Sequence, residues 1–128
     1  MSASVIRHTP TDHDPPGHAR VMTAVVGHRT VLSVSGEIDL ASAPLLADAV
    51  DEALRNGAHD LWIDLTRTGF MDSTGLHALL AAQRRVDELN RRLAVVCPAG
   101  PVRRLFDIAG LTDKLPLFAD RGAAHRGA

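Results

Sequence analysis

Gly69-Phe70-Met71-Asp72-Ser73-Thr74-Gly75-Leu76 is the stretch of sequence that decides the fold. It joins the clearest strand pattern, Leu61-Trp62-Ile63-Asp64-Leu65, to the clearest helical pattern, which begins near Thr74 and runs to about Leu89. Asp, Ser and Thr favour helix starts because their side-chain oxygens accept hydrogen bonds from the unpaired N–H groups of the first turn. The stretch therefore predicts a strand-to-helix turn. Its serine hydroxyl lies at the positive end of a helix dipole, where a phosphate is well accommodated.

Strand and helix patterns alternate on both sides of this turn. The first two strands predict an antiparallel hairpin through Gly27-His28-Arg29, and the later alternation predicts parallel strands joined by right-handed crossovers. Ser42 is a candidate N-cap for a helix that Gly57 ends. The predicted fold class is α/β, a single domain with a mixed β-sheet (an N-terminal hairpin plus parallel strands) and covering α-helices. The expected strands cover residues 21–26, 30–35, 59–65, 93–97 and 115–118, and the expected helices begin near residues 42, 74 and 102.

Two polar segments come directly after predicted strands. They are Gly36-Glu37-Ile38-Asp39-Leu40 and Asp72-Ser73-Thr74. Sites in open α/β sheets form at the carboxyl ends of strands. If the two strands are neighbours in the sheet, Asp39 and Ser73 lie at one edge.

Length and composition fit one compact domain with an aliphatic core. The chain has 128 residues, 45% of them hydrophobic and 3% aromatic, and a net charge of −1. Because both ends lack periodicity, we predict a flexible tail over residues 1–18, a domain over 19–119 and a flexible tail over 120–128. The single cysteine, the lack of a secretory signal and the lack of a membrane-spanning apolar run predict a cytoplasmic protein without membrane insertion.

Residue patterns for catalysis, metal binding and nucleic-acid binding are missing or incomplete. The only lysine, Lys114, follows no glycine-rich loop, and Ser73 has only half of a Gly-x-Ser-x-Gly motif. The seven histidines lack the spacing of a zinc site, and acidic residues interrupt the arginine doublets. We therefore expect no enzyme, no catalytic residue, no cofactor, no metal and no direct nucleic-acid partner.

Ser73 remains as a hydroxyl that another protein can modify. A phosphate adds about −1.5 to −2 charges, and a helix N-terminus tolerates that charge locally. A partner docked over the same edge would meet a new, partly desolvated charge, which costs about 2–5 kcal/mol of binding free energy. These magnitudes favour a switch of binding with little refolding.

The polar segments at residues 36–40 and 70–76, with Asp64-Leu65 between them, resemble those of STAS domains. The likeness covers about Val21 to Phe118, and within that family it is strongest to the bacterial anti-sigma factor antagonists. The resemblance implies a protein that, when unphosphorylated, binds an anti-sigma factor with serine kinase activity and so releases a sigma factor. The kinase would phosphorylate Ser73, and a serine phosphatase would reset it.

The resemblance also implies the roles of the surrounding residues. Asp72 would position Ser73, Thr74 and Gly75 would shape the docking turn, and Asp39 would lie at the adjoining edge of the partner-binding surface. Two alternatives stay open. One is a STAS-like subunit of a lipid-transport or transporter assembly, in which Ser73 only caps a helix. The other is a STAS domain that senses a nucleotide or small anion at the same helix end. The oligomeric state, the sigma factor and the signal are left open.

Overall fold

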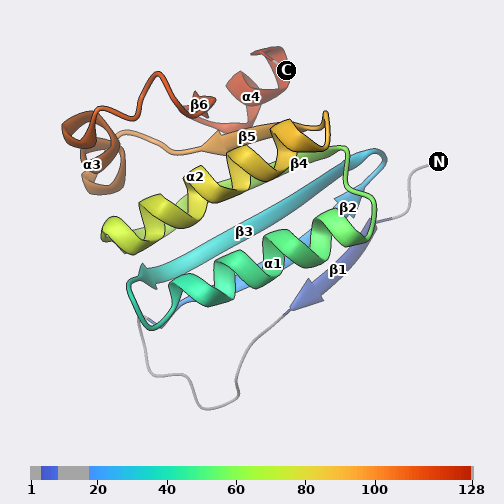
Figure 1. Cartoon of the computed structure of the whole chain (residues 1–128), viewed down its shortest axis with the longest axis horizontal. Helices are drawn as coiled ribbons and strands as arrows, with labels where there is room; N and C mark the ends of the chain where they lie inside the picture. The colour runs from blue at the N-terminus through green and yellow to red at the C-terminus, as the bar shows by residue number, and fades with distance from the viewer. Residues whose placement is uncertain (1–3, 9–17, 128) are drawn as a thin grey trace.

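The computed structural model of the chain describes residues 4–8 and 18–127. Its strands are β1 (Ser4–His8), β2 (Arg20–Val26), β3 (Arg29–Ile38), β4 (Asp60–Met71), β5 (Arg92–Val96) and β6 (Leu117–Phe118). Its helices are α1 (Ala43–Arg55), α2 (Ser73–Glu88), α3 (Pro101–Ala109) and α4 (Arg121–Gly127). The strands form one sheet in the order β1-β2-β3-β4-β5-β6 (Figure 1).

The sheet is mixed, as predicted. β2 pairs antiparallel with β1 and β3, whereas β3, β4, β5 and β6 are parallel to one another. The hairpin between β2 and β3 turns through Gly27 and His28, and Gly27 has a φ of 61°, a left-handed value that favours glycine. The predicted α/β class, with a hairpin added to parallel strands, is confirmed.

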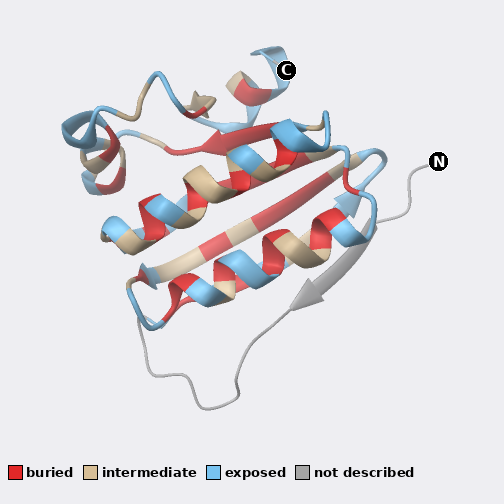
Figure 2. Ribbon diagram, viewed as in Figure 1, coloured by how far each residue is buried: buried red, intermediate tan, exposed pale blue. Residues whose placement is uncertain are grey.

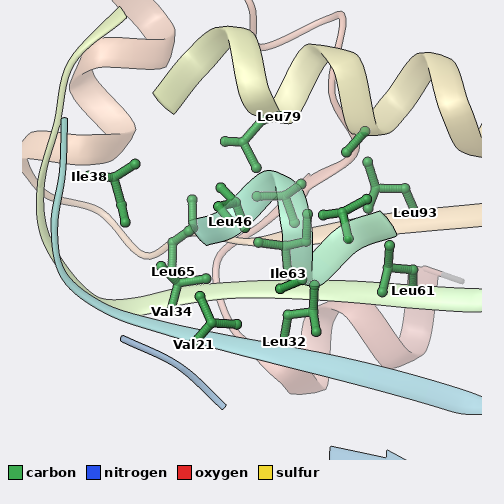
Figure 3. Close-up of a cluster of buried hydrophobic side chains, with 14 of the residues drawn as sticks. Val21, Leu32, Val34, Ile38, Leu46, Leu61, Ile63, Leu65, Leu79 and Leu93 are labelled. Carbon is green, nitrogen blue, oxygen red and sulfur yellow. The ribbon is translucent and has the colours of Figure 1, made fainter. Parts of the chain in front are cut away.

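The main core lies between the sheet and the two long helices. Buried and exposed residues alternate along α1 and α2 (Figure 2), as the helical periodicity predicts. In Figure 3, Leu46 of α1 and Leu79 of α2 meet side chains that rise from the strands. Burying one such side chain contributes about 1.5–3 kcal/mol to the free energy of unfolding. The labelled strand residues in this core are Val21, Leu32, Val34, Ile38, Leu61, Ile63, Leu65 and Leu93.

The opposite face of the sheet carries a smaller core under α4. Trp62 and Val96 belong to it, together with Ala124 of α4, which has 0% of its surface exposed. The predicted flexible tail over residues 120–128 is therefore wrong for residues 121–127, which form a packed helix. The Asp120 carboxylate accepts a hydrogen bond from the Ala123 N–H at 2.7 Å and so satisfies a donor of the first turn.

The N-terminal region also differs from the prediction. The expected tail over residues 1–18 contains a strand, β1, that pairs with β2 from Ser4↔Val26 to His8↔Met22. A five-residue strand is too short for its residue pattern to indicate a strand on its own. Residues 1–3, 9–17 and 128 lie outside the described residues, so the tail prediction stays a prediction there.

Strand β4 is longer than the expected 59–65. It continues to Met71, and its pairing with β3 shifts register between Ser33 and Ser35 and again between Gly36 and Glu37. Such irregularities insert extra residues and bend a strand. The extension brings the start of α2 to the place where β3 ends.

Candidate functional site

The loops after β3 and β4 meet at one edge of the sheet. The two strands are parallel neighbours, with Ile38 opposite Met71, and the Asp72 N–H donates to the Ile38 carbonyl at 3.1 Å. The ends of β3 and the starts of α1 and α2 lie together on the left of Figure 1. The structure therefore brings the predicted Asp39 and Ser73 regions to a common edge.

Asp72 caps helix α2. Its Oδ1 accepts hydrogen bonds from the backbone N–H of Thr74 at 2.9 Å and of Gly75 at 3.4 Å, and also from the Thr74 hydroxyl. The hydrogen bond from the Thr74 hydroxyl contributes most to holding the pKa of Asp72 below its usual value, and the backbone hydrogen bonds add to it. The carboxylate is thus ionised at neutral pH, and its Oδ1 is hydrogen-bonded within the turn that carries Ser73.

Ser73 and Thr74 differ sharply although they are neighbours. Ser73 is the first residue of α2 and is exposed, and its hydroxyl has no hydrogen-bond partner among the described residues. Thr74 is half-buried, and its hydroxyl donates to Asp72. Of the two hydroxyls, only that of Ser73 is free to react without breaking the cap.

Gly75 sits where the first turn of α2 packs tightly against the ends of β3 and β4. It is buried, and a Cβ at this position would lie 2.5 Å from Met71 Cγ and 2.9 Å from Ile38 Cγ2. Both distances are far below the usual carbon–carbon contact of about 3.5–4.0 Å. The absence of a side chain at Gly75 therefore fixes how deeply the first turn of α2 sits between the ends of β3 and β4.

The loop after β3 is closed by Asp39 and Ser42. Asp39 Oδ1 accepts the backbone N–H groups of Ala41 and Ser42, both at 3.1 Å. The Ser42 hydroxyl donates to the Glu37 carbonyl at 2.8 Å and accepts from the Asp39 N–H at 2.9 Å. Ser42 is the N-cap residue of α1, as predicted, but its side chain closes the loop instead of bonding to the helix, because Asp39 supplies oxygens to the first turn.

Three exposed apolar side chains at this end of the molecule were not predicted as site residues. Leu40, in the loop that Asp39 closes, is 75% exposed, and Phe70, just before the cap, is 49% exposed. Ile108 of α3 is 80% exposed, and α3 lies at the same end of the sheet (Figure 1). Two features of the sequence could have indicated them. Leu40 is a leucine in a polar loop, and Ile108 lies outside the apolar stripe of α3.

Other chemistry finds little support in the described part of the chain. No group of three or more His, Cys, Asp or Glu side chains within residues 18–127 is placed to hold a metal ion. Cys97 is buried, and burial raises the pKa of its thiol to about 11, which suits a core residue. In the same residues no helix has the length and apolar character needed to cross a membrane.

Comparisons with known proteins agree on one family. The STAS domain profile matches residues 20–124. The anti-sigma-B factor antagonist of Staphylococcus epidermidis is 30% identical over 82 residues, which are 64% of this chain and 76% of that protein.

Solved structures agree with this match. An anti-sigma factor antagonist from Mycobacterium paratuberculosis superposes with a TM-score of 0.75 at 30% identity, over 81% of this chain and 88% of the other. The anti-sigma factor antagonist SpoIIAA in its unphosphorylated form shares the fold, with a TM-score of 0.68 at 23% identity over 83% and 94% of the two chains. The resemblance seen in the sequence is confirmed: the chain belongs to the STAS domain family, among relatives that are anti-sigma factor antagonists.

Proposed function

We propose that this protein is an anti-sigma factor antagonist whose binding is switched by phosphorylation of Ser73. In the unphosphorylated state it binds an anti-sigma factor with serine kinase activity, and the sigma factor is released. The kinase phosphorylates Ser73 and ends the complex, and a serine phosphatase restores it. The observation that carries the proposal is the exposed Ser73 hydroxyl, which makes no hydrogen bond with the described residues and lies between the ionised Asp72 cap and the hydrogen-bonded Thr74.

The geometry supports a phosphate that stays on the surface. The N–H groups of Thr74 and Gly75, which would otherwise receive an anion at the helix start, already donate to Asp72. A phosphate on Ser73 would also lie beside the ionised Asp72 carboxylate. Because local donors are occupied and a like charge is adjacent, the added charge is not neutralised within the domain and would have to be desolvated under a docked partner.

The surface around Ser73 suits a protein partner. Leu40 and Ile108 present large apolar side chains to solvent at the same end of the sheet as the Ser73 turn. Interface cores bury such side chains, and a new charge inside a desolvated contact costs about 2–5 kcal/mol. That free energy corresponds to a loss of affinity between about thirtyfold and several thousandfold.

The test uses the full chain, and the binding partner is recovered by pull-down from the host. We expect Ser73→Ala to retain the anti-sigma factor and to abolish incorporation of phosphate from ATP. Ser73→Asp should weaken binding by about thirtyfold or more, measured by calorimetry. Asn90→Asp is the matched control, since it adds the same charge in the exposed turn that follows α2, at the opposite end of that helix from Ser73, without changing side-chain size.

The outcomes separate the proposal from its alternatives. Equal affinities for the unchanged protein, Ser73→Asp and the phosphorylated protein would refute the charge switch. Recovery of membrane transport components, with no kinase, would instead identify a subunit of a transport assembly in which Ser73 only begins a helix. The proposal places the protein in the cytoplasm, where a sigma factor acts.

A further inference from the structure

A second candidate site lies on the face of the sheet opposite α1 and α2. Between β2, β3, β4 and the start of α4, the structure has a cavity of about 520 Å³. Cavities that hold small molecules fall in the range of about 300–1,000 Å³. The side chains that matter here are those of Met22, Ser33, Ser35, Asp64, Arg67 and Arg121. We call this cavity the back pocket.

Among the residues that the structure describes, Asp64 is the only carboxylate that lines the back pocket, and both of its oxygens accept hydrogen bonds. Asp64 Oδ2 accepts from Arg121 Nε at 2.6 Å, and Asp64 Oδ1 accepts from both the backbone N–H and the hydroxyl of Thr66. Burial alone would raise the pKa of Asp64, but the bonds from Thr66 and Arg121 outweigh it and hold the pKa below its usual value. Asp64 is therefore an ionised group whose charge Arg121 already balances.

The remaining groups in the back pocket are mostly donors. Arg121 uses Nε for Asp64 and Nη2 for the Ser33 hydroxyl at 3.1 Å, which leaves its other terminal nitrogen. Arg67 has no ion-pair or hydrogen-bond partner among residues 18–127, and neither does the Ser35 hydroxyl. Among the described residues, donors therefore exceed acceptors in this pocket, and no carboxylate pairs with the Arg67 guanidinium.

The neighbouring charges within residues 18–127 leave the balance around the back pocket positive. Arg20 is exposed and pairs with Ser35 across β2 and β3, so it adds a third guanidinium on this side. Glu37, exposed and two residues beyond Ser35, is the nearest opposing carboxylate along β3. The whole chain has a net charge of −1, so this positive region is local and does not reflect overall composition.

We propose that the back pocket binds a small phosphate monoester. Arg67 and the free end of Arg121 hold the phosphoryl oxygens, since a guanidinium donates in parallel to two oxygens of one phosphate. The Ser33 and Ser35 hydroxyls supply further donors to the same group. Met22, 42% exposed, offers an apolar wall for the organic part of the ligand. No residue of this pocket belongs to the Ser73 turn.

The test is a titration of the ¹⁵N-labelled full chain, followed by amide chemical shifts, with phenyl phosphate and with inorganic phosphate. Sodium chloride at matched ionic strength serves as the salt control. We expect saturable shifts at residues 33–35 and 66–67, with tighter binding of phenyl phosphate because its ring contacts Met22. Arg67→Gln should weaken phenyl phosphate binding by about tenfold or more, as loss of a charged donor pair implies.

Three comparisons make the result decisive. Arg84→Gln removes the same charge from the exposed face of α2 and should leave affinity unchanged, and so should Ser73→Ala. Ser35→Ala, which leaves every ion pair intact, should weaken binding by about threefold to tenfold. Shifts confined to residues 73–75 would place the anion at the α2 N-terminus and overturn the proposal. The proposal would also be overturned if Arg67→Gln and Arg84→Gln bound phenyl phosphate equally well, or if the protein had equal affinity for phenyl phosphate and inorganic phosphate. A titration that does not saturate up to about 10 mM phenyl phosphate would overturn it as well.

Discussion

Gly75→Ala tests whether close contact with the sheet positions the Ser73 turn. The new methyl group would lie 2.5 Å from Met71 Cγ and 2.9 Å from Ile38 Cγ2. Met71 can change rotamer, but it is buried, and Ile38 is branched at Cβ and has 0% of its surface exposed. The first turn of α2 must therefore move away from the ends of β3 and β4, or both side chains must repack.

The expected size of the effect follows from two opposing contributions. Overpacking of this kind costs about 1–3 kcal/mol of the free energy of unfolding. Alanine is the better helix former by about 1 kcal/mol in a helix interior, and by less in the first turn. The net destabilisation is then about 1–2 kcal/mol. A shift of the first turn also moves Ser73 relative to Asp39, so phosphorylation should slow.

Gly69→Ala is the matched control. Gly69 lies in the same segment, and a Cβ there meets no atom within 4 Å. Gly69→Ala should change the free energy of unfolding by no more than about 0.5 kcal/mol. Urea unfolding of both variants gives the free energies, and the rate of phosphate incorporation by the recovered kinase reports on the turn. If Gly75→Ala is as stable and as well phosphorylated as Gly69→Ala, the close contact does not position Ser73.

Three further predictions concern groups away from this contact. Ser42→Ala should lower the free energy of unfolding by about 1–3 kcal/mol, because the Glu37 carbonyl and the Asp39 N–H lose their partner; urea unfolding checks it, and an unchanged midpoint would contradict it. Asp64→Asn should cost about 1–3 kcal/mol at pH 7. Since the pKa of Asp64 is lowered in the folded state, its contribution is present above about pH 4 and is lost as the pH falls through the folded pKa, so the two proteins should converge in acid. Cys97, with its pKa raised to about 11, should react with a thiol reagent at pH 8 far more slowly in the folded than in the unfolded protein, and comparable rates would show that the thiol is accessible.

The parts of the fold that the sequence predicted are those with strong local signals. The four-residue spacing of Leu46, Val50 and Leu54 marked the buried face of α1, and all three are buried. The residue type of Asp72 and its place after a strand predict a helix cap, and Asp72 caps α2. Alternation of elements then sufficed for the mixed sheet, since right-handed crossovers allow few arrangements.

The parts that were missed depend on contacts between distant residues. Helix α4 is short and has little apolar periodicity. Its position is set by the Arg121–Asp64 ion pair and by the packing of Ala124 against the sheet. The extension of β4 beyond Leu65 follows from irregular pairing with β3, and a single-strand pattern does not encode register shifts. The exposure of Leu40 follows from the loop that Asp39 and Ser42 close, and these hydrogen bonds have no periodic residue pattern.

A switch built this way does not require the domain to refold. The Ser73 side chain makes no hydrogen bond with the described residues, so phosphorylation breaks no contact that holds α2 in place. The favourable dipole at the helix start, about 0.3–1 kcal/mol, is opposed by the adjacent Asp72 carboxylate, so the two local effects tend to offset each other. Under a docked partner the same charge has a larger effect, because docking would exclude the water that screens it. Phosphorylation can therefore change binding by several kcal/mol while the free energy of unfolding barely moves.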